Sequence, residues 1–158
     1  MAMGSPAASA VDDDLYREII LDHYRHPRHH GRVDPADATV HGHNPLCGDE
    51  VDVSLRLRDG RIDAVGFEGQ GCSISLASAS MMAEQVAGLP VAAARAVVER
   101  FKQMIVDGAD PGDLESLGDL EALQGVRRYA SRVKCAVLPW NALESGLAGA
   151  GGHLEAVP

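Results

Sequence analysis

The sequence predicts an α+β fold in which a small antiparallel sheet, made of a hairpin plus one further strand, packs against several helices. Three observations predict it: a helical pattern near the start, alternating residues around a hairpin turn, and helical patterns through most of the second half. Strands and helices do not alternate regularly along the chain. A doubly wound parallel sheet is therefore not expected.

The first helix is expected to begin at the aspartates of DDDLYREIILDHYRHP and to stop at Pro27. Leu15, Tyr16 and Ile19 recur in it at helical spacing. Four histidines cluster around its end, where positive charge favours the helix dipole, and we interpret them as capping and surface charge. They are His23, His26, His29 and His30.

A β-hairpin is expected next, because apolar and polar residues alternate over residues 51–57 and the pair Asp59-Gly60 is typical of a two-residue hairpin turn. The return strand is RIDAVGFEG. Its alternation is less regular, since Ile62 and Val65 lie three residues apart, which indicates a bulge or an early change of face.

The remaining elements are predicted to be helices. One starts near Cys72 and ends before Gly88 and Pro90, and its Met81-Met82 pair falls at core spacing, which favours packing over soft-metal ligation. Others are expected at residues 91–106, in the second half of 108–125 and at 131–147. Pro139 should kink the last helix or mark its true first turn.

A chain of 158 residues with 46% hydrophobic content predicts one domain, placed at residues 11–148. The small residues of 1–10 and the glycine-rich 149–158 are expected to be flexible tails. There are 14 basic and 23 acidic residues and the net charge is −9, so nucleic acid is not an expected partner. No apolar run suits a membrane span or a signal peptide, and a cytoplasmic protein is expected.

The three cysteines, an odd number, favour reduced thiols over a disulfide framework. Cys47 and Asp49 flank Gly48 in a loop, Cys72 follows Gly-Gln-Gly, and with Cys135 they would supply the four ligands of a zinc tetrahedron. Glycines allow close approach, and a helix start after Cys72 favours a thiolate. The spacing matches no zinc finger, however, and an equally open alternative makes the cysteines small buried residues and the Gly-Asp-Glu segment a solvated turn.

Two further groups have open interpretations. Arg132 and Lys134 put two cations beside Cys135. They could support a thiolate electrostatically, help to dock a partner, or simply belong to a solvated helix start. His41 and His43 form an H-x-H pair that would point both rings to one side of a strand. We favour surface or core imidazoles over a rival metal site for this pair, because three thiols and Asp49 already complete a tetrahedron.

Three segments, NPLCGD, GFEGQGCSISLASASMM and RVKCAVLPW, resemble the cysteine motifs of the U-type iron–sulfur cluster assembly proteins, the IscU-like or NifU N-terminal family. The resemblance runs from about Leu15 to Leu147. Within this family, the sequence is similar to the zinc-binding SufU branch rather than to the IscU scaffolds. It has Lys134 where the scaffolds have histidine, and it carries an extra segment ending LGDLEALQGV.

The resemblance implies an IscU/NifU-like fold and one Zn²⁺ bound by Cys47, Asp49, Cys72 and Cys135. It also implies that Cys47 accepts persulfide sulfur from a SufS-type cysteine desulfurase and that the sulfur passes to downstream iron–sulfur assembly proteins. Because a zinc ion closed by four protein ligands would be structural, we expect Cys47 to leave the metal when the desulfurase docks. Asp49, the one hard ligand, should loosen the coordination.

Three functions remain open. The first is a zinc-dependent sulfurtransferase, although whether a sulfur acceptor is an enzyme in its own right is left undecided. The second is a scaffold that holds a transient iron–sulfur cluster on the same thiolates. The third is a domain in which zinc only stabilises the fold.

Overall fold

The computed structural model of the protein describes residues 6–45, 48–108, 114–148 and 153–156, with side chains for 14–45, 48–108 and 117–148. Its elements are α1 (Pro6–Arg25), β1 (Ala38–Asn44), β2 (Asp49–Arg58), β3 (Arg61–Gln70), α2 (Ser73–Val86), α3 (Val91–Ile105), the 3-10 segment η1 (Leu114–Arg128), α4 (Ala130–Ala148) and β4 (His153–Ala156). No helix in these ranges is both long and apolar enough to cross a membrane.

The sheet has the strand order β3-β2-β1-β4. β1 pairs antiparallel with β2, and β2 pairs antiparallel with β3, which confirms the predicted hairpin plus one strand. β4 adds to the free edge of β1 in parallel orientation, with Val40 opposite Leu154. The sequence prediction had placed this short segment in a tail, because four residues carry little signal until an existing strand edge supplies their hydrogen bonds.

The hairpin is built as its sequence predicts. Asp59 and Gly60 both have positive φ, 53° and 76°, which is the conformation of a two-residue turn that matches strand twist. The expected bulge is also present: Leu57 pairs with Ile62 but Arg56 pairs with Ala64, so Asp63 is an additional residue in β3.

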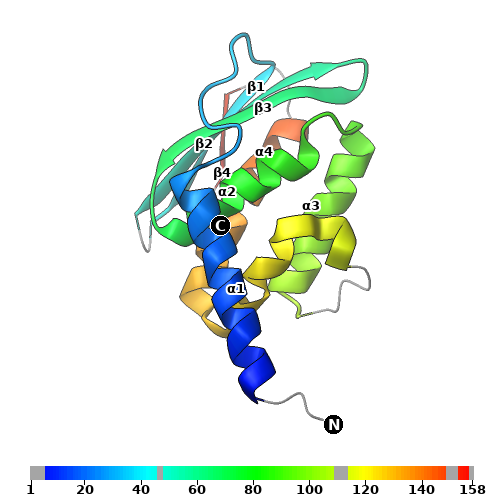
Figure 1. Cartoon of the computed structure of the whole chain (residues 1–158). Helices are drawn as coiled ribbons and strands as arrows, with labels where there is room; N and C mark the ends of the chain where they lie inside the picture. Colours follow the sequence, from blue (N-terminus) through cyan, green and yellow to red (C-terminus); the bar gives the residue numbers. More distant parts are fainter. Residues whose placement is uncertain (1–5, 46–47, 109–113, 149–152, 157–158) are drawn as a thin grey trace.

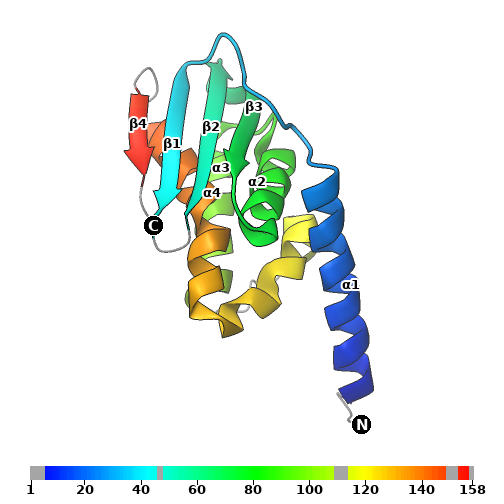
Figure 2. The same ribbon diagram turned by 90° about the vertical axis from the view of Figure 1, so that its left-hand side faces the viewer.

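Figures 1 and 2 show the sheet as one layer and the helices as a second layer on one of its faces. α4 packs against β1 and β2, α2 packs against β3 and α4, and α1 lies along α2 and η1. β1 alternates strictly between buried and partly exposed residues, because alternate side chains point toward the helices. Met81 and Met82 are buried in this core, as predicted.

The centre of the helical layer is an aromatic contact between α3 and α4. The rings of Phe101 and Trp140 stack at a centroid distance of 4.3 Å, and both side chains are fully buried. The Trp140 indole N–H donates to Ser78 Oγ at 2.9 Å, and Ser78 donates to the carbonyl of Ala136 at 2.6 Å. The polar atoms of this contact are therefore satisfied inside the core.

Two elements differ from the sequence prediction. α1 begins at Pro6 rather than at the aspartates, since proline suits a first helical turn and the alanines after it are good helix formers. The predicted short helix is the 3-10 segment η1, interrupted at Gly118 with φ 56°. Of the two placements predicted for Pro139, the structure has the one inside the helix, because α4 begins at Ala130.

Candidate metal centre

Asp49, Cys72 and Cys135 come together at one end of the sheet. Each offers one ligand atom, and these three atoms all lie within 4.8 Å of one another. Asp49 is the first residue of β2, Cys72 caps the start of α2, and Cys135 lies near the start of α4. Three segments that are distant in the sequence therefore converge on one point, and that these three residues bind a metal stays a prediction.

Asp49 and Cys72 contact each other directly. The backbone N–H of Cys72 donates to Asp49 Oδ1 at 3.0 Å, and the Cys72 sulfur lies 3.5 Å from Asp49 Oδ2. Asp49 is only 3% exposed. A buried carboxylate is stable only with hydrogen bonds, an opposite charge or a metal. The Cys72 N–H supplies one such hydrogen bond, and a metal ion held with the two thiols would supply positive charge.

Gly71 makes this contact possible. A Cβ at position 71 would lie 2.6 Å from Asp49 Oδ1 and 2.7 Å from Ser75 Oγ, closer than any side chain tolerates. The glycine before Cys72 thus leaves the space in which the carboxylate approaches the first turn of α2. Ser75, in that turn, donates to the Cys72 carbonyl at 3.1 Å and fixes the backbone of the ligand.

Cys135 reaches the same point from α4. It is 2% exposed, and its sulfur lies 3.5 Å from the carbonyl oxygen of Ser131, one turn earlier in the helix. The Cys72 side chain is partly exposed, so one side of the cluster faces the surface. Cys47, predicted as the fourth ligand, lies outside the described residues.

The donors that are described fit a zinc ion. Zinc binds cysteine thiolates and carboxylate oxygens in a tetrahedron, and two sulfurs and one oxygen supply three of its corners. Thiolates also hold iron–sulfur clusters, so the donor set is compatible with either kind of metal centre. The donor atoms of Asp49, Cys72 and Cys135 are therefore of the kinds that bind a metal.

The H-x-H pair belongs to the other face of the sheet. The rings of His41 and His43 stack at 6.4 Å on the same side of β1, as a strand dictates. Carboxylates of β2 face His41, with Asp52 Oδ1 2.6 Å from its Nδ1 and Glu50 Oε1 3.3 Å from its Nε2. Within the ranges that the structure covers, neither histidine belongs to a group of three or more metal-type ligands.

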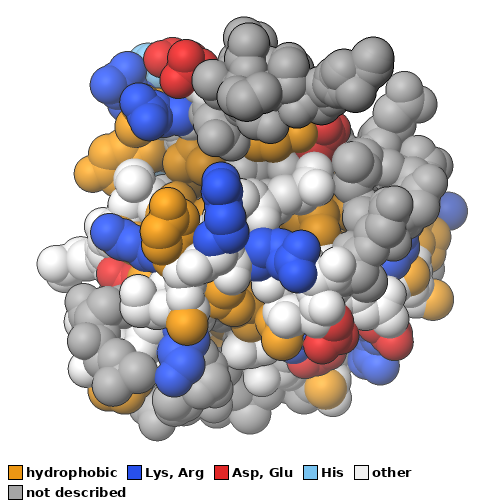
Figure 3. Space-filling view, turned by 90° about the horizontal axis from the view of Figure 1, so that it is seen from below, with side chains coloured by type: hydrophobic (Ala, Val, Ile, Leu, Met, Phe, Trp, Pro, Cys, Tyr) orange, Lys and Arg blue, Asp and Glu red, His pale blue; other side chains and the backbone are white. Residues whose placement is uncertain are grey.

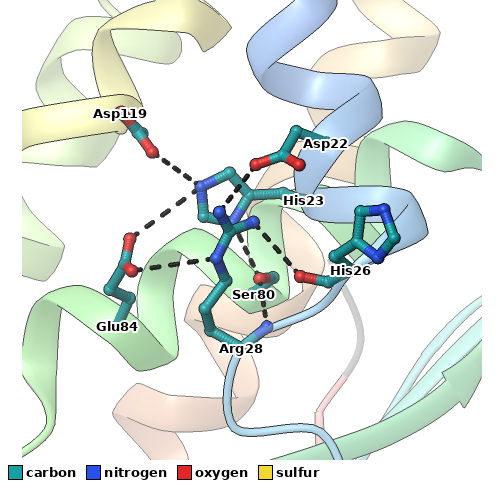
Figure 4. A network of polar contacts seen from close by, with 7 residues as sticks. All are labelled: Asp22, His23, His26, Arg28, Ser80, Glu84 and Asp119. Atoms are coloured by element: carbon teal, nitrogen blue, oxygen red, sulfur yellow. Dashed lines mark hydrogen bonds and ion pairs between the residues drawn. The ribbon is translucent and has the colours of Figure 1, made fainter.

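The interpretation of His23 as surface charge is wrong. Its side chain is fully buried, and Figure 4 shows it enclosed between α1, α2 and η1. Nδ1 lies 2.8 Å from Ser80 Oγ, and Nε2 lies 2.8 Å from Asp119 Oδ2. A helix-end histidine has the same sequence signal whether it caps or is buried, but its position four residues after Ile19 already placed it on the apolar face of α1.

Arg132 and Lys134 are both exposed at the start of α4. Arg132 lines a surface pocket with residues of α1 and α2, whereas Lys134 does not line it. The two cations therefore have different surroundings, although they are close in the sequence. Their electrostatic support for a Cys135 thiolate stays a prediction.

Comparison with known sequences finds that the chain matches one protein family and is similar to several characterised proteins. Residues 15–136 match the family described as the NifU-like N terminal domain. The chain is 43% identical to the zinc-dependent sulfurtransferase SufU of Bacillus subtilis (strain 168), covering 86% of this chain and 91% of that protein. It is 38% identical to the iron–sulfur cluster assembly scaffold protein IscU of Streptococcus pyogenes serotype M1, covering 84% and 82%.

A solved structure agrees with these relatives. The fold superimposes with a TM-score of 0.77 on a protein of Fervidobacterium islandicum AW-1, described as a candidate iron–sulfur cluster assembly scaffold protein for the SUF system. The two are 35% identical, and the match covers 82% of this chain and 94% of that one. The predicted IscU/NifU-like fold is confirmed.

Proposed function

Because the chain belongs to the family of NifU-like N-terminal domains, we propose that it is a zinc-dependent sulfur acceptor in iron–sulfur cluster assembly. The observation that carries the proposal is the convergence of Asp49, Cys72 and Cys135, whose ligand atoms lie within 4.8 Å of one another. The 43% identical relative named as a zinc-dependent sulfurtransferase supports the choice of metal. Zinc would hold the thiols as thiolates without oxidising them.

Cys47 is the proposed sulfur acceptor, by the resemblance of NPLCGD to the family motif. Its thiolate would attack the terminal sulfur of a persulfide on a SufS-type cysteine desulfurase. The S–S bond of the donor breaks, the desulfurase cysteine leaves as a thiolate, and Cys47 becomes the new persulfide. The exchange balances in atoms and electrons, so it needs no external oxidant or reductant.

The burial and contacts of Cys72 and Cys135 support a holding role for these two ligands. Cys135 is buried within α4. Cys72 is held at the N-terminus of α2 by the hydrogen bond from its backbone N–H to the Asp49 carboxylate. In the sequence, Cys47 falls after the last residue of β1 and before the first residue of β2. Because Cys72 and Cys135 are tied to helices of the packed core, Cys47 is the ligand that we propose to leave the metal and return.

A scaffold for a transient iron–sulfur cluster is the second candidate. The observation that favours it is the 38% identity to a protein named IscU, together with thiols that suit either metal centre. Metal analysis separates the two: a colourless protein with about one zinc per chain favours the sulfur acceptor, and a brown protein with iron and sulfide favours the scaffold.

The test of sulfur transfer uses a SufS-type desulfurase with cysteine as substrate. The unmodified protein should accelerate turnover and become labelled with persulfide, and Cys47→Ala should do neither while it keeps the native circular dichroism spectrum. Ser9→Ala, a change of similar size before the motif-bearing region, is the matched control. Unchanged acceleration by Cys47→Ala would refute the assigned role of this thiol.

A further inference from the structure

A pocket of about 420 Å³ opens beside the metal centre, where α1, the start of α2, the end of η1 and the start of α4 meet. It lies next to the ligands in the sequence as well as in space, because Ser73 follows Cys72 and Arg132 precedes Cys135 by one helical turn. The function proposed above gives no role to this pocket.

The pocket is positively charged although the chain is acidic. Arg17, Arg128 and Arg132 line it, and no Asp or Glu is among the described residues that do, against a net charge of −9 for the whole chain. Arg17 and Arg132 make no ion pair with any residue in the described part of the chain. Elsewhere arginines do pair, as Arg56 does with Asp63 at 2.8 Å.

The remaining lining is largely apolar. Ile20 of α1, Ile74 of α2 and Val126 of η1 contribute to it. Tyr16 forms a fixed wall, since its hydroxyl donates to Glu121 Oε1 at 2.8 Å. Tyr129, also a lining residue, is 60% exposed, so apolar surface continues outward from the pocket. Figure 3 views the molecule from below and shows Lys and Arg side chains interspersed among hydrophobic ones.

We infer that this pocket docks an acidic segment of a partner protein, with a bulky apolar side chain seated on Ile20, Ile74 and Val126 and carboxylates paired with Arg17 and Arg132. A guanidinium pairs with a carboxylate through two parallel hydrogen bonds, and tyrosine and arginine are enriched at the centres of protein interfaces. A lone small anion would leave most of the 420 Å³ and its apolar lining unused. An acidic peptide with one large apolar residue matches both the charge and the volume.

The test measures binding of a fluorescently labelled synthetic peptide, in which glutamates flank one phenylalanine, to the full metal-loaded chain by anisotropy. The peptide should bind, and Arg17→Glu and Arg132→Glu should each weaken binding by about tenfold, because each replaces an attraction with a repulsion. Arg58→Glu makes the same charge change at an exposed hairpin position outside the pocket, and it should alter binding by less than about twofold.

Peptide controls test the chemistry of the occupant. Replacing the phenylalanine by alanine should weaken binding, and a peptide with lysines in place of glutamates should not bind. The inference is overturned if the acidic peptide does not bind, if Arg58→Glu weakens it as much as Arg17→Glu, or if inorganic phosphate displaces it at equal charge concentration. Zinc content and persulfide labelling are measured on the same samples, so failure here is distinct from failure of the proposed function.

Discussion

Two clusters of ligand-type side chains are built around α2, and they differ in how their charges are balanced. At the start of the helix, Cys72 meets Asp49 and Cys135. Farther along, Ser80 and Glu84 face His23 and Asp119, a group that also has the residue types and spacing of a metal site. The first contains two thiols, which lose a proton when they bind a metal, whereas the second contains a histidine and two carboxylates.

The second cluster is satisfied by protons that the protein itself supplies. The Asp119 carboxylate can only accept, so at 2.8 Å the Nε2 of His23 must carry a proton. On the other side of the ring, Nδ1 lies 2.8 Å from the Ser80 hydroxyl, whose oxygen also accepts the backbone N–H of Arg28 at 2.8 Å. Each polar atom in this series of hydrogen bonds therefore has a partner.

The same cluster already contains a cation. The Arg28 guanidinium lies 2.6 Å from Asp22 Oδ2 and 3.9 Å from Glu84 Oε2, where it supplies positive charge to the carboxylates. A metal ion would have to displace the Nε2 proton and tolerate the guanidinium. Residue types alone therefore do not make a metal site, since complementary donors and acceptors can turn the same types into a structural network.

The largest expected effect is on the metal centre. Asp49→Ala should reduce the zinc content from about one per chain to near zero, because it removes a ligand and the acceptor of the Cys72 N–H. Elemental analysis after purification without added metal gives the content. Asp49→Asn, which keeps the size and the acceptor but not the charge, should retain an intermediate amount. Full zinc content in Asp49→Ala would show that this carboxylate is not a ligand.

The second cluster should control stability without affecting metal. His23→Ala should lower the free energy of unfolding by about 3 kcal/mol, because it opens a cavity and leaves Ser80 and Asp119 without their partner. Urea denaturation monitored by circular dichroism measures the change. Zinc content should stay at the unmodified level, and a loss of zinc in a folded His23→Ala protein would contradict the separation of the two clusters.

A smaller effect is expected from crowding the first cluster. Gly71→Ala should weaken zinc affinity by about tenfold, since the added methyl must displace Asp49 and Ser75. Competition with a chromophoric chelator measures the affinity. Gly125→Ala is the matched control, because its methyl would meet only the flexible end of Arg128, at 3.3 Å. Equal affinities in the two variants would mean that the close approach at Gly71 has no part in metal binding.

The smallest effect concerns the cation of the second cluster. The hydrogen bond from Arg28 holds the pKa of the exposed Asp22 carboxyl below its ordinary value. A depressed folded pKa adds stability that is present above the unfolded pKa and is lost as the pH falls through the folded pKa. Between about pH 5 and pH 2, Asp22→Asn should therefore lose slightly less stability than the unmodified protein, as measured by thermal unfolding. An identical pH dependence would show that the pair contributes nothing.

Local sequence signals predicted much of the fold. Asp59-Gly60 predicted the hairpin, the spacing of Ile62 and Val65 indicated its bulge, and the helical spacing of the residues after Cys72 predicted the helix start. These features depend on the backbone preferences of adjacent residues, which are local. The early start of α1 at Pro6 and the strand β4 were missed, since alanine-rich and glycine-rich segments have weak patterns of their own.

The sequence by itself determined which residues are candidates for the chemistry, namely three cysteines and an aspartate beside one of them, and it holds the motifs that place the chain in its family. Tertiary structure decided what surrounds them. It brought Asp49, Cys72 and Cys135 within 4.8 Å, buried His23, and placed Arg17 and Arg132 on one pocket. Such contacts join residues far apart in the chain, and the packing of helices on the sheet sets them rather than any neighbour in the sequence.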